Sequence, residues 1–304
     1  DPRINRNNAA GAGWQIDVTP DIRPDPIHLY HLFLITKYIP VEIWVQVTTD
    51  GVFAPLRSRT GEVMTMKKQS VLAIQHIGFQ WEMEDPFLFC AHHEDNYPAG
   101  NKNQGIDPER LRGREVGNDF VIKDGYRMYH GQEVPGFPVH PHRGFETVTI
   151  VTQGYVDHFD SLGAYGRYGQ GDVQWMTAGK GCQHAEMFPL VNGNGPNPLE
   201  LFQIWLNLPK KDKFVHAAYK MLWHEDIPVV EEHSQNGTKA SVTVVAGSWR
   251  GQAAVTPAPD SWVADPSHQV GIFLIHMEAG SVLSIPATSP ASNRNLIFYK
   301  GDTI

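Results

Sequence analysis

Two short motifs, well separated along the chain, contain the side chains best suited to chemistry. His140 and His142 form one pair and His184 and Glu186 the other, with one residue between the members of each pair. Because alternate residues of a β-strand point to the same face, each pair would present both side chains together. Two such pairs facing each other inside a small barrel would surround one ion with three imidazoles and one carboxylate. The spacing therefore predicts a metal site.

The segments that must position these pairs have the pattern of short β-strands joined by turns. Residues 148–151 and 155–159 are strand-like runs on either side of a turn at residues 153–154. Residues 199–208 form a longer apolar run that stops at Pro209. Since many short strands with almost no helical periodicity are typical of barrels and sandwiches, we predict an all-β fold.

The length and composition indicate a globular protein of ordinary type. The chain has 304 residues, of which 41% are hydrophobic and 19% charged, and is long enough for two domains. Its formal net charge of -8 argues against direct nucleic-acid binding, which needs clustered Lys and Arg. Charged residues interrupt the most apolar stretch, residues 27–47, so we predict no membrane span.

The cysteines and the first residue bear on the compartment. Cys90 and Cys182 are the only two cysteines, so no disulfide framework supports the fold and an intracellular, reducing compartment is expected. The chain begins with Asp1 rather than Met. This leaves a mitochondrion or another organelle as one alternative, and the cytoplasm or nucleus as the other.

Residues 136–186 carry a resemblance to a known family. The run from Gly136 through Glu146 to Gly154 has the layout of the first cupin motif, and residues 179–184 have the layout of the second. More closely, the chain from about residue 70 onwards resembles the pirin family. Besides the central stretch, the segments that carry this resemblance are residues 85–88, 160–163, 171–179, 203–209 and 226–230.

The resemblance implies two tandem cupin β-barrels with one non-haem iron ion in the first. The family's ligands correspond to His140, His142, His184 and Glu186. Glu146 occupies the position at which many other cupins place their carboxylate ligand, so we expect it to support the site without binding the ion. Three imidazoles and a carboxylate suit Fe(II), and they also suit Mn, Ni or Zn.

Cys182 stands where pirins usually carry an aliphatic residue. Strand alternation places it on the same face as His184 and Glu186, so its thiol is predicted to point towards the metal pocket. Two interpretations remain open. Cys182 could fill space as a small hydrophobic residue, or a nearby cation could lower the pKa of its thiol and make it oxidisable.

We predict three parts from the resemblance. Residues 1–70 are an N-terminal extension, residues 71–212 the metal-binding barrel and residues 213–304 a metal-free second barrel, predicted to be incomplete because the chain ends after a mid-barrel strand. Residues 94–135 are expected to form a long loop inserted into the first barrel, with His92 and His93 in solvated chain before it. Loops of such length are commonly functional or bound to a partner.

Two classes of function compete, and we predict an iron-binding subunit or interaction module of a larger assembly, with an enzyme as the alternative. Some pirins resemble quercetin 2,3-dioxygenases, which implies an Fe(II)-dependent dioxygenase acting on a flavonol-like or other metal-chelating small molecule. The extension at residues 1–70 and the insertion at about 94–135 instead favour a subunit or interaction module of a larger assembly, with both segments contacting protein partners. A third alternative is an iron-dependent transcriptional co-regulator, as other family members are described.

Overall fold

The protein is all-β and consists of two compact units. The computed structural model describes residues 77–286 and 293–301, together with the backbone of several strands between Ile16 and Met64. Within these residues there is no α-helix, only three short 3-10 segments at Pro108–Leu111, Trp262–Ala264 and Pro266–His268. No helix in this part of the chain is both long and apolar enough to cross a membrane. The all-β prediction is confirmed.

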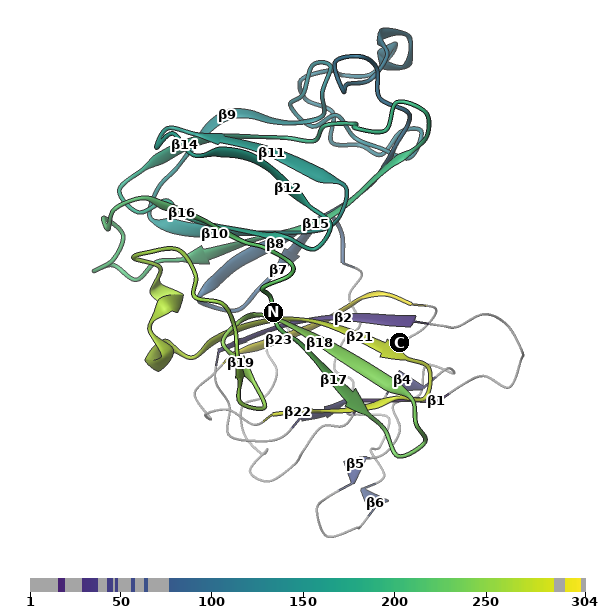
Figure 1. The fold of residues 1–304 in the computed structure, drawn as a ribbon, viewed down its shortest axis with the longest axis vertical. Coiled ribbons are helices and arrows are strands. Elements are labelled where there is room, and N and C mark those ends of the chain that lie inside the picture. The colour runs from purple at the N-terminus through teal and green to yellow at the C-terminus, as the bar shows by residue number, and fades with distance from the viewer. Residues whose placement is uncertain are drawn as a thin grey trace. The chain divides into compact units, whose positions relative to one another are not determined.

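The first unit, here called the site unit, comprises residues 78–226 and 256–264 and contains two antiparallel sheets (Figure 1). The six-stranded sheet has the order β16 (Ala218–Leu222), β13 (Val173–Thr177), β10 (Phe145–Gln153), β15 (Asn197–Asn207), β8 (Phe87–Tyr97) and β7 (Gln80–Glu82). The four-stranded sheet has the order β12 (Tyr165–Gly169), β11 (Tyr155–Asp160), β14 (Cys182–Met187) and β9 (Gly136–His142).

The inner faces of these two sheets enclose the core of the site unit. Along β14, Cys182, His184 and Glu186 are buried, whereas the residues between them are at least partly accessible. This is the alternation expected of a strand with one face inside. At the turn between β10 and β11, Gly154 has φ +78 and a Cβ there would lie 2.7 Å from the Pro198 carbonyl oxygen, so glycine is required.

The inserted segment, residues 98–135, packs into the core at one end of the site unit (Figure 1). Arg127 Nε donates to Asp95 Oδ1 at 3.0 Å, and Tyr129 donates its hydroxyl proton to the other oxygen of Asp95. Four apolar side chains of the insertion join a buried cluster with residues of β8, β10 and β15. They are Ile106, Tyr126, Met128 and Tyr129.

Strand β8 extends further than the sequence indicated. It runs to Tyr97 and pairs along almost its whole length with β15, so residues 94–97 are strand rather than loop. His93 is 3% exposed and lies among aromatic rings, including that of Tyr129 at 5.0 Å. The prediction of solvated chain at His92 and His93 is therefore wrong, because pairing with the distant β15 buries this stretch.

The second unit contains residues 227–255 and 265–304 together with the described N-terminal strands. One sheet has the order β17 (Val229–His233), β18 (Lys239–Ala246), β21 (Val270–Glu278), β2 (Leu29–Lys37) and β23 (Arg294–Lys300). Another has the order β3 (Ile43–Val45), β22 (Val282–Ile285), β1 (Ile16–Thr19) and β4 (Val47–Thr48). Two small hairpins complete it, β19 (Ser248–Trp249) with β20 (Gln252–Ala253), and β5 (Leu56–Arg57) with β6 (Val63–Met64).

Strand pairing groups two segments in ways that chain order does not suggest. Strand β2, inside the predicted extension at 1–70, pairs with β21 from Leu29↔Glu278 to Lys37↔Val270. Strand β16 lies beyond residue 212 but pairs with β13 in the site unit. The three-part domain division remains a prediction. Most of residues 1–70 lie outside the described residues.

Candidate metal centre

The four predicted ligands come together on two neighbouring strands of the four-stranded sheet. Strands β9 and β14 are antiparallel, and His140 is directly opposite His184. The two pairs thus lie side by side and do not face each other across the barrel. A register shift between His184 and Glu186 places Glu186 opposite Phe137.

The separations within this group are close to those that one ion requires. One ring nitrogen from each of His140, His142 and His184 lies within 4.8 Å of the other two. Glu186 Oε2 lies 3.7 Å from His184 Nε2. Ligand atoms bound at about 2.1 Å to a common ion are at most about 4.2 Å apart, so only a small contraction is needed.

The donor atoms of the histidines are available for an ion. His140 Nδ1 lies 2.9 Å from the Pro138 carbonyl oxygen, and a proton donated there leaves Nε2 as the free lone pair. His142 Nε2 and both ring nitrogens of His184 are buried and have no hydrogen-bond partner among the described residues. Since unpartnered buried polar atoms are costly, the site fits a metal ion that would satisfy them.

Burial keeps the imidazoles of His142 and His184 neutral. Together with the neighbouring rings of His184 and His140, it lowers the pKa of His142 from 6.5 to about 3, while Glu186 opposes the shift. Burial likewise lowers the pKa of His184 to about 3, again helped by nearby histidines. Neutral imidazole is the form that binds metals, so neither His142 nor His184 needs to lose a proton before binding an ion at neutral pH.

Two residues of the opposite sheet hold Glu186. Gln203 on β15 donates from Nε2 to Glu186 Oε2 at 2.7 Å. Thr149 on β10 makes a longer contact of 3.4 Å with Oε1. Gln203 was not among the residues predicted for the site. Its signal was a polar side chain between two apolar residues, Phe202 and Ile204, of β15.

Aromatic side chains line the neighbourhood of His142. Trp205 stacks on Phe145 with ring centroids 4.3 Å apart, and the ring centroids of Phe89 and Trp205 are 4.6 Å apart. The ring of His142 contacts Trp205 at 5.1 Å and Phe145 at 5.0 Å. We call Phe89, Phe145 and Trp205 the aromatic wall.

His158 on β11 is a further histidine that the sequence analysis missed. One nitrogen of His158, His184 and one oxygen of Glu186 also lie within 4.8 Å of one another. However, His158 Nε2 lies 3.1 Å from Asp160 Oδ2, and Nδ1 lies 3.0 Å from Gln174 Nε2. Both ring nitrogens are engaged, so His158 packs beside the site without offering a lone pair.

Glu146 is not brought together with the histidines. It points away from the inner face of β10 that carries Thr149, and it is fully buried. Trp175 Nε1 at 2.6 Å, Thr177 Oγ1 at 3.0 Å and the Trp262 amide at 2.8 Å all donate to it. Burial raises the pKa of Glu146 against the effect of these donors. Its role is to join strands β10 and β13 to the Trp262 segment.

Cys182 lies inside the barrel, as strand alternation predicts. It packs against Met176 and Ala178, and its Sγ lies 3.6 Å from Ser161 Oγ. Burial raises the pKa of this thiol, which the Ser161 hydrogen bond only partly offsets. These surroundings favour the interpretation of Cys182 as a packing residue.

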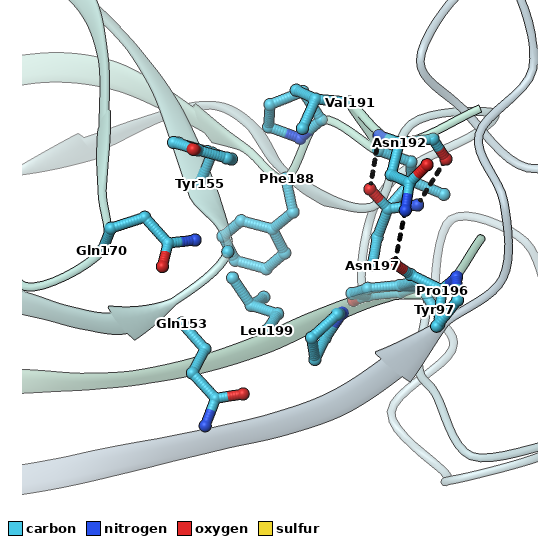
Figure 2. A pocket seen from close by; sticks show the side chains of 14 residues that line it. Tyr97, Gln153, Tyr155, Gln170, Phe188, Val191, Asn192, Pro196, Asn197 and Leu199 are labelled. Carbon is cyan, nitrogen blue, oxygen red and sulfur yellow. Dashed lines mark hydrogen bonds between the residues drawn. The ribbon is translucent and has the colours of Figure 1, made fainter. Parts of the chain in front are cut away.

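A separate hollow of about 220 Å³ lies at the end of the barrel where β10 turns into β11 (Figure 2). Phe188 and Leu199 form its apolar floor, and hydrogen bonds between Asn192 and Asn197 shape one side. None of the four predicted ligands lines it. The hollow is therefore distinct from the metal centre.

A small antiparallel barrel with three histidines and one glutamate on adjacent strands defines a cupin with a candidate metal site. The pirin family model matches residues 69–206. A "Pirin-like protein" of Solanum lycopersicum is 41% identical over 157 residues, which cover 51% of this chain and 50% of that protein. A "Putative quercetin 2,3-dioxygenase" of Vibrio cholerae is 36% identical over 65% of this chain and 67% of its own length. The chain belongs to the pirin family.

Other relatives and solved structures are similar over part of their length. A second "Putative quercetin 2,3-dioxygenase", from Pseudomonas aeruginosa, is 37% identical over 65% of this chain and 63% of its own length. The chain thus spans about half to two thirds of the relatives named here. A quercetin 2,3-dioxygenase structure from Acinetobacter baumannii matches 70% of this chain and 73% of its own at 23% identity, with a TM-score of 0.45. A nickel(II) complex of a bacterial pirin from Escherichia coli matches 50% of this chain and 77% of its own at 22% identity, with a TM-score of 0.28.

Proposed function

We propose that this chain binds one Fe(II) ion through His140, His142, His184 and Glu186. The observation that carries the proposal is the set of buried imidazole nitrogens of His142 and His184 that lack a hydrogen-bond partner among the described residues. Mn, Ni or Zn would suit the same ligands, so metal supply also decides which ion is present.

The activity that this site supports best is an Fe(II)-dependent dioxygenase of the quercetin 2,3-dioxygenase type. An iron ion held by these four residues would supply a one-electron redox couple and could bind dioxygen and a chelating substrate. The aromatic wall beside His142 offers flat apolar surfaces on which a planar, metal-chelating molecule such as a flavonol could stack. Relatives named as quercetin 2,3-dioxygenases support this choice.

Elemental analysis and dioxygen uptake test the proposal together. Wild-type protein loaded anaerobically with Fe(II) should hold about one iron per chain and consume dioxygen when quercetin is added. The double variant His140→Ala, His184→Ala should lose both properties. His233→Ala, at an exposed histidine of the second unit, is the matched control and should keep them. A folded wild-type protein that takes up no metal would overturn the proposal.

A specific observation supports a second candidate, an interaction module within a larger assembly. Phe120, Val121 and Ile122 are consecutive residues of the insertion and are 41%, 75% and 58% exposed. A run of exposed apolar side chains marks a surface that a partner could cover. Residues 1–70 would add a second contact. An iron-dependent transcriptional co-regulator would be one such module, with iron altering the surface that a partner recognises.

Native mass measurement separates this candidate from the first. The double variant Val121→Ser, Ile122→Ser should release a partner that wild-type protein retains, while Val229→Ser, at a similarly exposed residue, should not. If wild-type protein and both variants have the mass of the chain alone, the interaction proposal for the insertion fails. Dioxygen uptake would be unaffected in either case.

A further inference from the structure

The amide of Gln203 occupies a junction between the metal centre and the aromatic wall. Gln203 lies on β15, opposite Thr149 of β10 and Ala91 of β8. Its Nε2 donates to Glu186 Oε2 at 2.7 Å and makes a 3.4 Å contact with Thr149 Oγ1. Its Oε1 accepts from Trp205 Nε1 at 3.2 Å.

Chemistry allows this amide only one orientation. An ionised carboxylate can only accept hydrogen bonds, and an indole N–H can only donate one. The NH₂ group of Gln203 must therefore face Glu186, and its carbonyl oxygen must face Trp205. If the amide were flipped, its oxygen would face the Glu186 carboxylate and its NH₂ group would face the Trp205 N–H, and both hydrogen bonds would be lost. Each contact therefore favours the orientation that the other requires.

The same carboxylate oxygen is close to the ligand set. Glu186 Oε2 accepts from Gln203 and also lies 3.7 Å from His184 Nε2. Hydrogen bonds to a ligating carboxylate fix its orientation and raise metal affinity. Trp205, at the other end of the amide, also contacts the ring of His142. Gln203 thus connects two predicted ligands, one directly and one through Trp205.

We infer that Gln203 is a positioning residue that holds Glu186 in its metal-binding orientation and ties it to Trp205 of the aromatic wall. The inference rests on the metal binding proposed above. A purely structural role would require only that the polar groups of Gln203 be satisfied. The positioning role further requires that the metal's affinity and its ligand field depend on this amide.

Co(II) titration of the full chain tests the inference without depending on catalytic activity. Co(II) reports on its own coordination through its visible absorption bands, and chelator competition gives its dissociation constant. Gln203→Met keeps the side-chain volume but removes both hydrogen bonds. It should raise the dissociation constant about 10-fold to 100-fold and alter the visible bands. Gln153→Met, at an exposed glutamine on the neighbouring strand β10, should change neither.

A second variant keeps the test decisive. Trp205→Phe retains an aromatic ring but removes the N–H that locks the amide, and it should produce the same spectral change in weaker form. If Gln203→Met binds Co(II) with the wild-type affinity and visible spectrum, the inference is overturned. If Gln203→Met fails to fold, a wild-type Co(II) spectrum in Trp205→Phe would overturn it instead. If wild-type protein binds no Co(II), the metal centre itself is refuted and the inference fails with it.

Discussion

At the scale of single residues, the ring of His184 lies close to the rings of three other histidines. Its ring centroid lies 4.5 Å from that of His140 and 4.8 Å from that of His142, and 5.4 Å from that of His158 on β11. Burial and repulsion from neighbouring histidines lower the pKa of His142 and of His184 to about 3.

These pKa values predict how the stability of the metal-free protein depends on pH. Between about pH 6.5 and pH 3, the unfolded chain binds protons at His142 and His184 that the folded chain does not bind. The free energy of unfolding should therefore fall as the pH is lowered through this window, by at most about 1.4 kcal/mol per pH unit for each histidine. Urea denaturation at pH 7 and pH 5 measures the change. His184→Gln should reduce the slope, and an unchanged slope in this variant would contradict the assignment.

Cys182 gives a second prediction at this scale. Because its thiol packs against Met176 and Ala178 and its pKa is raised, it should remain a thiol under mild oxidation. The Cys182→Val variant should contain as much iron as the wild-type protein. In peroxide, the variant and the wild-type protein should lose iron at the same rate. If the variant retains iron where the wild-type protein loses it, Cys182 couples the metal to the redox state instead.

At the scale of elements, the strand pair β9 and β14 carries the predicted ligands, while Thr149 on β10 and Gln203 on β15 contact Glu186. Gly136 at the start of β9 has φ +130, and a Cβ there would lie 2.5 Å from the Glu186 carbonyl oxygen. Glycine therefore permits the close approach of β9 to β14 at the level of Glu186. The ligand geometry depends on backbone contacts as well as on the side chains.

The insertion is fixed to β8 by a buried ion pair. Arg127 donates from Nε and Nη2 to the two oxygens of Asp95, and both side chains are buried. Arg127→Met would leave the carboxylate buried without its cation and should destabilise the protein by about 3–5 kcal/mol. Arg167→Met, which removes a more exposed pair with Asp157, should cost less than about 1 kcal/mol.

Chemical denaturation of both arginine variants gives these values. Hydrogen exchange should also show faster exchange across residues 98–135 in Arg127→Met only. Equal destabilisation by the two substitutions would mean that the pair with Asp95 is not the anchor of the insertion.

At the scale of the whole molecule, the proposed metal binding would be linked to folding. An ion that binds the folded site unit but not the unfolded chain stabilises the protein by about 2.7 kcal/mol when its free concentration is 100 times the dissociation constant. Thermal denaturation with increasing Fe(II) or Co(II) should therefore show a rising midpoint. The midpoint of the His140→Ala, His184→Ala variant should not rise. A midpoint that rises equally in the variant would indicate binding elsewhere.

The sequence alone was sufficient for the properties that depend on local backbone geometry. The period of a β-strand is two residues, so the spacing of His140 with His142 and of His184 with Glu186 already placed each pair on one face. The same period placed Cys182 on the inner face, and the turn-separated strands indicated an all-β fold. The pirin resemblance, which the family match confirms, then gave the four predicted ligands.

Tertiary structure decided which segments are neighbours, because strand order and register depend on contacts between residues far apart in the chain. It placed the two ligand pairs side by side on β9 and β14, and it brought Gln203 to Glu186 from the opposite sheet. It turned Glu146 away from the histidines, and it buried His93 in a strand that the local composition suggested was loop. None of these placements follows from a short-range pattern, since each is set by the packing of whole sheets around one core.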